Sequence, residues 1–465
     1  MNSAARQYWL LVAGLAAVEL ASWGVYHNHV LGVVTFWILV AGGLVLGLRR
    51  LDLLAYATLA ELVLGSKGYL FFWHTGTTTI SIRIGLFVVL GLAAVWQTVY
   101  RRQYRSWPRK IFLPIIPILS WVVIEVVAGM WHHRALSAIY QDANAYLYLV
   151  IAWFWVVAWR GRTSWRANGL TVILAATTLI GIKSWLMMVL FGHNIPGLLT
   201  VYHWIRDTGV GEVALIGNQT YRVFFQSQIY CLFGFLLVFG GFMTQRVPRW
   251  WVWPMLWSAV GLYISLSRSF LIGLVIGLLV MAVYALHIRK ISWLRRAWVL
   301  VPLALWAWLM MSWAINFPAV INPYGLNNGL SSRLNDVGFS QASTARFNQI
   351  KPLWRAITTQ PIFGSGFGAT ATYFSTDPRV HDWRTTFAFE LGYLDMWLKL
   401  GVIGLGLFGW WLWTIWQRLR RHEHAILFVG SFVALLGVHL TSPYLNHPLG
   451  LGWLVFLSLY SYDQI

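Results

Sequence analysis

Long apolar stretches separated by short polar segments run along almost the whole chain. Many of these stretches are 17 to 22 residues long, which is enough for an α-helix to cross about 30 Å of hydrocarbon. They are continuous and do not alternate at every second residue, which favours helices over the strands of a barrel. The pattern predicts fourteen membrane spans, near residues 8–25, 31–48, 51–72, 80–100, 111–131, 146–159, 168–190, 224–243, 250–266, 269–286, 297–314, 396–417, 424–441 and 447–461.

The expected fold is therefore an all-α, polytopic transmembrane helix bundle with about 12 to 14 spans, since several of the stretches are short. We expect a single integral membrane domain over residues 1–465. Two long segments, 191–223 and 315–395, interrupt the pattern. Within the second, the apolar residues between Phe347 and Ile357 follow a helical period, so part of this large loop is predicted to be an ordered helix.

The composition supports a membrane protein. Apolar residues make up 58% of the 465 positions and charged residues 10%, whereas soluble domains carry about 25% charged residues. The net charge of +20 would suit a nucleic-acid partner, but the basic residues lie in short clusters between apolar stretches. The single cysteine, Cys231, excludes an internal disulfide and a cysteine-based metal site.

The basic clusters predict the orientation of the bundle. With fourteen spans, every cluster falls on the same side as the N-terminus, and the clusters hold more than half of the 34 lysines and arginines. Because cytoplasmic loops carry the excess of positive charge, we expect both termini to be cytoplasmic and the chain to lie in the cytoplasmic membrane. Residues 315–395 are then a large extracytoplasmic loop. The clusters are Arg49-Arg50, Arg101 to Lys110, Arg160 to Arg166, Arg246 with Arg249, Arg289 to Arg296, and Arg418 to Arg421.

Arginine also occurs on the outer side, where positive charge is disfavoured. An unpaired charge near the membrane boundary is costly, and guanidinium binds phosphate as a bidentate donor, so an anionic substrate is the expected complement. An arginine near a helix end can instead extend to lipid phosphate without binding a substrate. We interpret Arg206, Arg333, Arg379 and Arg384 as solvated loop charges. The remaining outer arginines are Arg222, Arg268, Arg346 and Arg355.

Four short motifs follow one another between residues 215 and 415. They are YRVFFQSQIY (221–230), LSRSFLIGL (266–274), ARFNQIKPLWRAITTQPIFGSGFG (345–368) and ELGYLDMWLKLGVIGL (390–405). This series resembles the O-antigen ligase and O-antigen polymerase superfamily. Its members show an arginine before a helix, Ser-Arg at the start of a later helix, then an arginine with Trp and Pro-x-x-Gly-x-Gly. A polar residue before Tyr-Leu and Gly-x-x-Gly completes the family pattern.

The resemblance implies glycosyl transfer at the outer membrane face, from a glycan carried on polyprenyl diphosphate. The diphosphate gains negative charge as it leaves and needs fixed positive charge beside it. We expect Arg222 and Arg268 to be catalytic, and Arg222, Arg268, Arg346 and Arg355 to bind the diphosphate. Such arginines can replace a metal ion, so no metal and no other cofactor is expected.

A base that activates the acceptor hydroxyl is also expected. Ligases of the superfamily usually carry a histidine just before the Tyr-Leu motif, and in this sequence the position holds Glu390. We expect Glu390 to be the base, with His381 as the second candidate. Glu390 could instead be a structural carboxylate that pairs with an arginine. His381 could instead be a surface histidine in the loop. The missing histidine favours a polymerase over a ligase.

Three functions therefore stay open. A polymerase would join repeat units from polyprenyl-diphosphate carriers, and a ligase would transfer a finished glycan to another acceptor. A flippase of lipid-linked oligosaccharide is less favoured, because no internal repeat typical of transporters is visible and the arginines gather at the outer face. The expected partners are the polyprenyl-diphosphate-linked glycan, membrane lipids and other polysaccharide-assembly proteins, with no nucleic acid.

Overall fold

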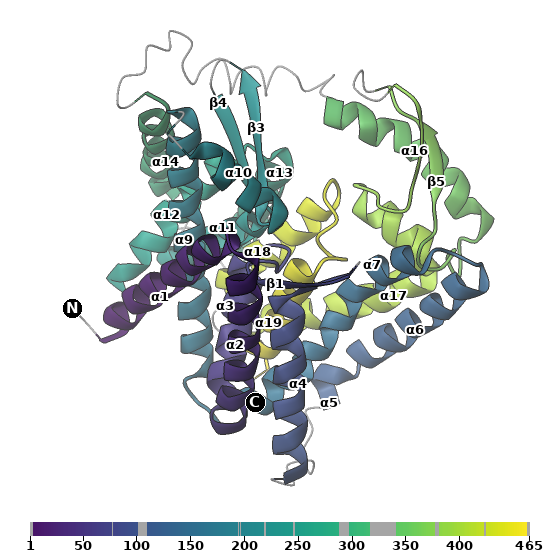
Figure 1. The fold of residues 1–465 in the computed structure, drawn as a ribbon, viewed down its shortest axis with the longest axis horizontal. Helices are drawn as coiled ribbons and strands as arrows, with labels where there is room; N and C mark the ends of the chain where they lie inside the picture. The colour runs from purple at the N-terminus through teal and green to yellow at the C-terminus, as the bar shows by residue number, and fades with distance from the viewer. Residues whose placement is uncertain are drawn as a thin grey trace.

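The computed structural model describes most of the chain. Arg333 and Arg379, two of the arginines interpreted as loop charges, lie outside the described residues. Helices dominate the described part and form a bundle around an extensive apolar core (Figure 1). The described residues are 3–76, 78–100, 109–193, 195, 197–217, 220–244, 247–287, 297–316, 341–376, 381–422 and 425–462.

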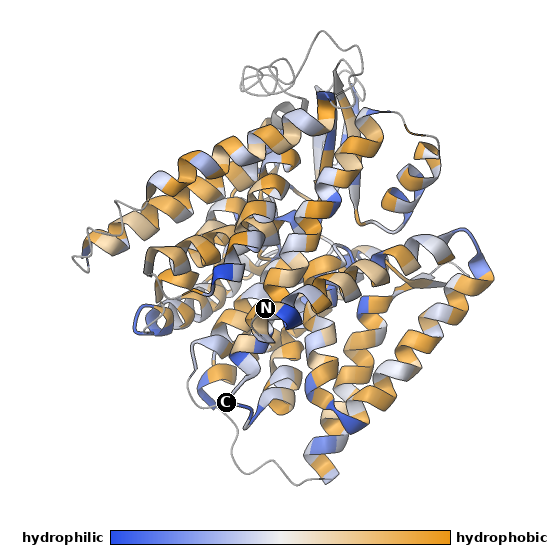
Figure 2. Cartoon of the chain, turned by 90° about the vertical axis from the view of Figure 1, so that its left-hand side faces the viewer, coloured by the Kyte–Doolittle hydropathy of each residue, from blue (hydrophilic) through white to orange (hydrophobic). Residues whose placement is uncertain are grey.

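Ten helical segments of the described residues are long and apolar enough to cross a membrane, which confirms the predicted all-α polytopic bundle. Figure 2 shows apolar residues along most helices and hydrophilic residues mainly at helix ends and in connections. The helices that form these segments are α1 (Ser3–Tyr26), α2 (His29–Arg49), α4 (Ile82–Tyr100), α5 (Arg109–Phe112) with α6 (Ile115–Trp131), α7 (Leu136–Leu147) with α8 (Ile151–Trp159), α9 (Trp165–Gly192), α11 (Ile229–Thr244), α13 (Arg268–His287), α14 (Leu300–Asn316) and α17 (Gly392–Leu419).

The other four predicted spans correspond to shorter helices. Helices α3 (Leu51–Leu64) and α12 (Val252–Ser265) have 14 residues each, and α18 (Ala425–His439) and α19 (Pro448–Tyr460) have 15 and 13. All four are shorter than the roughly 20 residues needed to span a bilayer. Helices α18 and α19 are buried on nearly every face, so their apolar composition reflects packing inside the protein.

Both long segments between spans contain regular structure. Helix α16 (Gln341–Thr359) confirms the helix predicted in the large loop, and α10 (Leu198–Asp207) lies in the other segment. The sequence analysis did not predict three antiparallel hairpins: β1 (Phe72–Thr75) with β2 (Thr78–Ser81), β3 (Gly211–Gly217) with β4 (Thr220–Phe225), and β5 (Ala371–Phe374) with β6 (Trp383–Thr386). The β3–β4 hairpin and α16 lie at the top of Figure 1, at what we call the hairpin end of the bundle. Short 3-10 helices are η2 (Tyr148–Val150), η3 (Gln226–Gln228) and η4 (Arg249–Trp251).

Helix α9 occupies the centre of one half of the bundle, where it packs against α1, α3, α12 and α14. In the other half, α18 packs against both α11 and α13. Two buried ion pairs join neighbouring helices: Lys183 with Glu19 at 2.5 Å, and Arg83 with Glu61 at 2.9 Å. A buried charge is tolerated when a partner of opposite sign neutralises it, so these pairs fix helix contacts.

Helix α17 is broken at Gly401, whose φ of +65° lies in the region that favours glycine. The backbone N–H groups of Val402 and Ile403 donate to the carbonyls of Pro361 and Ile362 at 3.0 and 3.2 Å. Interrupted helices at membrane depth are tolerated where other protein groups satisfy the freed backbone. The loop before α17 therefore supports the break.

Candidate active site

A cavity of about 310 Å³ lies at the hairpin end of the bundle. Arg222, Arg268, Arg346 and Glu390 all line it, so the fold brings together four of the six site residues that the sequence suggested. The other lining residues are Glu212, Phe224, Gln226, Leu266, Ser267, Ser269, Ser442, Pro443, Tyr444 and His447.

The β3–β4 hairpin supplies one wall through strand alternation. Glu212 pairs with Phe224 across the hairpin, and alternate residues of a strand share a face, so Arg222 lies on the same side. Val223 and Phe225 face the opposite way and are buried in the core. The guanidinium carbon of Arg222 lies 4.7 Å from the centre of the Phe224 ring, a cation–π contact that orients the charge.

The turn between α12 and α13 supplies the second wall. Leu266 there has a φ of +47°, a left-handed conformation that costs a non-glycine residue about 1–2 kcal/mol. Such strain is frequent at functional sites, and here it starts α13 directly at Arg268. The carbonyl of Ser265 accepts the Nε–H of Arg222 at 3.1 Å. The positive N-terminus of α13 adds to the charge of both arginines.

Helix α16 and the chain before α17 supply the third wall. Arg346 Nε lies 2.6 Å from Glu390 Oε2, with side-chain exposures of 26% and 51%. Leu353 and Ile357 anchor α16 in a small core that also contains Phe389, the neighbour of Glu390. The ion pair therefore sits on anchored backbone, while its charged groups remain accessible from the cavity.

The segment 440–447, between α18 and α19, closes the cavity. Ser442 Oγ lies 2.8 Å from Ser269 Oγ on α13. Tyr444 Oη donates to the carbonyl of Gln226 at 3.0 Å. Burial raises the pKa of Tyr444, so its hydroxyl stays a protonated donor.

His447 is the N-cap residue of α19, and its Nδ1 accepts the N–H of Leu449 at 3.3 Å. Burial lowers the pKa of His447 to about 3, and the nearby charges of Arg83 and Lys67 lower it as well. The imidazole is therefore neutral at ordinary pH. A neutral ring whose Nδ1 accepts a hydrogen bond carries its proton on Nε2.

A buried ion cluster lies next to this segment. Lys399 Nζ is 2.6 Å from Asp142 Oδ1 and 2.7 Å from Asp395 Oδ1. The Nδ2 atom of Asn446 donates to the second oxygen of Asp395 at 2.7 Å, and Gly368 N–H donates to that of Asp142 at 2.8 Å. The cluster thus joins α7, α17, the large loop and the residue beside His447.

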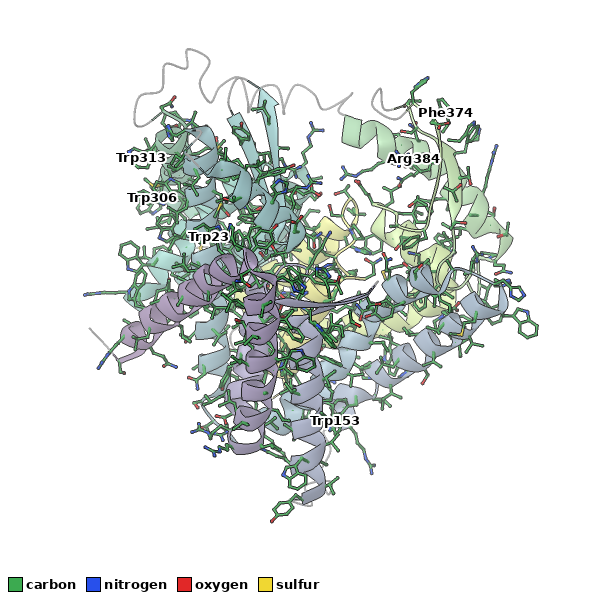
Figure 3. All side chains as sticks on the ribbon, in the orientation of Figure 1. Trp23, Trp153, Trp306, Trp313, Phe374 and Arg384 are labelled. Carbon is green, nitrogen blue, oxygen red and sulfur yellow. The ribbon has the colours of Figure 1, made fainter. Side chains whose placement is uncertain are left out.

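Two predicted site residues lie elsewhere. His381 is exposed and packs edge-on against the ring of Phe374, at 5.0 Å between ring centres. Figure 3 labels Phe374 and Arg384 on the β5–β6 hairpin, at the upper right of the view. Arg355 is exposed on α16, about 13 Å along the helix from Arg346. Neither His381 nor Arg355 lines the cavity, so the expectation that they belong to the site finds no support in its geometry.

The sequence analysis did not single out Glu212, Tyr444 or His447 as site residues. Alternating apolar residues through Val213 and Val223 could have indicated the hairpin that carries Glu212. Tyr444 and His447 lie in the short polar segment TSPYLNHP between two apolar stretches. Its Ser, Tyr, Asn and His side chains could have marked a loop that carries polar function.

The cavity combines three guanidinium groups with two carboxylates, and neutral donors lie beside them. A diphosphate fits such a set, because guanidinium binds phosphate oxygens through paired N–H groups. A carboxylate in the same cavity can accept a proton from a hydroxyl.

Comparison with known proteins gave one match. Residues 253–409 match the family model described as O-antigen ligase. This match confirms the resemblance that the four motifs indicated. Arg268, Arg346, Arg355, His381 and Glu390 fall inside the matched region, whereas Arg222 and His447 fall outside it. No curated protein and no solved structure matches the chain.

Proposed function

We propose that this chain is a membrane glycosyltransferase that uses a polyprenyl-diphosphate-linked glycan, a proposal supported by the match of residues 253–409 to the O-antigen ligase family model. The observation that carries the proposal is the convergence of Arg222, Arg268, Arg346 and Glu390 on one cavity. We assign the cavity to the outer face of the cytoplasmic membrane, with 315–395 extracytoplasmic and both termini cytoplasmic. This orientation rests on the basic clusters, which fall on one side when α3, α12, α18 and α19 cross the membrane together with the ten longer segments.

In the proposed reaction, an acceptor hydroxyl attacks the anomeric carbon of the donor sugar. The bond between that carbon and the diphosphate oxygen breaks, and the diphosphate leaves with the electron pair. Arg222, Arg268 and Arg346 stabilise the negative charge that develops on the leaving group. The hydroxyl proton passes to Glu390 as the new glycosidic bond forms.

The ion pair between Arg346 and Glu390 couples donor binding to this proton transfer. In the free protein, Glu390 Oε2 lies 2.6 Å from Arg346 Nε, so this oxygen is occupied. A diphosphate that binds Arg346 competes with Glu390 for the same guanidinium. Donor binding then leaves the carboxylate oxygen available for the acceptor hydroxyl.

We propose polymerisation of repeat units as the specific reaction, because Glu390 replaces the histidine usual in ligases. The description of the matching family, O-antigen ligase, favours transfer of a finished glycan to another acceptor as the second candidate. Both reactions use the same donor chemistry and differ in the acceptor.

The test is glycan transfer by the purified protein in liposomes that contain a polyprenyl-diphosphate-linked repeat unit. We expect release of polyprenyl diphosphate together with lengthening of the glycan. Arg268→Ala should reduce the rate by about 10²- to 10³-fold, as expected when one group that stabilises a leaving charge is removed.

The outcomes separate the candidate functions. Release that occurs only after a different acceptor is added identifies a ligase. Movement of the intact lipid-linked unit between leaflets, with no bond broken, contradicts the transferase and supports a flippase.

A further inference from the structure

His447 presents a second kind of group to the cavity, distinct from the arginines. Its Nδ1 accepts the Leu449 N–H at 3.3 Å, and a backbone N–H can only donate. The ring proton is therefore on Nε2. The residue is partly buried and lines the cavity. Among the described residues, none accepts a hydrogen bond from Nε2, so this donor has no protein partner there.

His447 cannot act as a base through Nε2, because that atom already carries the proton. It also cannot act as a cation, since the pKa of about 3 keeps the ring neutral. What remains is a fixed, uncharged hydrogen-bond donor. The cap on α19 holds the ring in place, and Tyr444 packs near it with the ring centres 6.1 Å apart.

The cavity that His447 lines also contains uncharged groups. Ser442, Ser269, Gln226 and Tyr444 line the same cavity, and hydrogen bonds hold three of them through their side chains. Neutral donors and acceptors suit sugar hydroxyls, whereas guanidinium suits phosphate oxygens. A few well-placed polar groups of this kind commonly fix the orientation of a ligand.

We propose that the Nε2–H of His447 donates a hydrogen bond to an oxygen of the donor glycan, which makes His447 a specificity-determining residue. The proposal rests on the proposed function, because it needs a lipid-linked glycan in the cavity. The other available acceptor is a phosphate oxygen of the diphosphate, and the experiment distinguishes the two.

Two substitutions separate the two ring nitrogens. His447→Asn keeps an acceptor near the position of Nδ1, so it preserves the cap on α19 and removes the Nε2 donor. His447→Gln places an N–H near the position of Nε2 and loses the cap. His203→Asn, on the exposed face of α10, is the matched control outside the cavity.

The measurement is binding of two lipids to the purified protein: polyprenyl diphosphate with the glycan repeat unit and polyprenyl diphosphate without it. For His447→Asn we expect weaker binding of the glycan-bearing lipid by roughly three- to tenfold, the size of one hydrogen bond. Binding of the bare diphosphate and the melting temperature should stay close to those of the parent. His447→Gln should bind the glycan-bearing lipid better than His447→Asn while melting at a lower temperature.

Equal binding of the glycan-bearing lipid by His447→Asn and the parent would overturn the proposal. If His447→Asn weakened the binding of both lipids equally, the proposal would also be overturned, because the partner of His447 would then be the phosphate. Failure of the proposed function looks different: the parent would bind the glycan-bearing lipid and break no bond in it. A parent that binds neither lipid contradicts both proposals.

Discussion

Two sets of charged side chains lie close to each other in this molecule and are held in opposite ways. Lys399, Asp142 and Asp395 are between 3% and 9% exposed, and each is paired with a protein group of opposite charge. Arg346 and Glu390 are 26% and 51% exposed and share one contact at 2.6 Å. The buried set does not line the cavity, whereas the exposed set does.

The difference shows how to separate charges that serve the fold from charges that serve a ligand. Breaking a buried pair leaves a charge without solvent and is strongly destabilising. Breaking an exposed pair returns both groups to water and costs little. Substitutions in the buried set should therefore lower stability, whereas substitutions in the exposed set should lower activity.

The largest effect on stability is expected from Lys399→Met. This substitution leaves Asp142 and Asp395 side by side without their cation, and we expect a loss of roughly 3–5 kcal/mol in unfolding free energy. Thermal unfolding in detergent measures it, with Lys351→Met on the exposed face of α16 as the control. Equal melting temperatures for Lys399→Met and the parent would show that the cluster does not stabilise the fold.

Glu390→Gln should leave stability near that of the parent and lower the transfer rate. The amide keeps the shape of the carboxylate but cannot take up the acceptor proton, so a loss of about 10²- to 10⁴-fold in kcat is expected. Glu212→Gln, the other carboxylate of the cavity, shows whether the effect belongs to Glu390. An unchanged rate in Glu390→Gln together with a large loss in Glu212→Gln would move the role of base to Glu212.

The smallest effect on stability is expected from Arg346→Ala, the counterpart of Lys399→Met in the exposed set. Loss of a solvent-accessible ion pair should change the unfolding free energy by less than about 1 kcal/mol, while donor binding weakens. Melting temperature and lipid binding are measured on the same preparation. A destabilisation as large as that of Lys399→Met would remove the distinction between the two sets.

The sequence predicted the helical bundle well because hydrophobic length is a local property of the chain. It placed α18 and α19 to within two residues of their observed bounds, but it did not show that protein surrounds them, since an apolar run reads the same whether protein or lipid surrounds it. Their burial depends on tertiary contacts, those of α18 with α11 and α13 and those of α19 with α8 and α17, which periodicity does not encode.

The candidate site was partly predictable because short motifs, like hydrophobic length, are a local property of the chain. Arg222, Arg268, Arg346 and Glu390 were selected by motifs, and the cavity unites them. His381 and Arg355 share a region with these motifs, but their side chains lie outside the cavity. His447 was missed because its importance depends on where α19 begins relative to β4, which is a matter of tertiary packing.

The break in α17 bears on how the protein is made. To the machinery that inserts membrane proteins, residues 392–419 offer one apolar segment, long enough to enter the bilayer as a single helix. The partners that satisfy the break at Gly401 come from residues 361 and 362 and from Trp121, whose indole N–H donates to the Leu400 carbonyl at 2.9 Å. These groups emerge from the ribosome before α17 does. The final shape of this helix therefore depends on lateral packing against segments that are made before it.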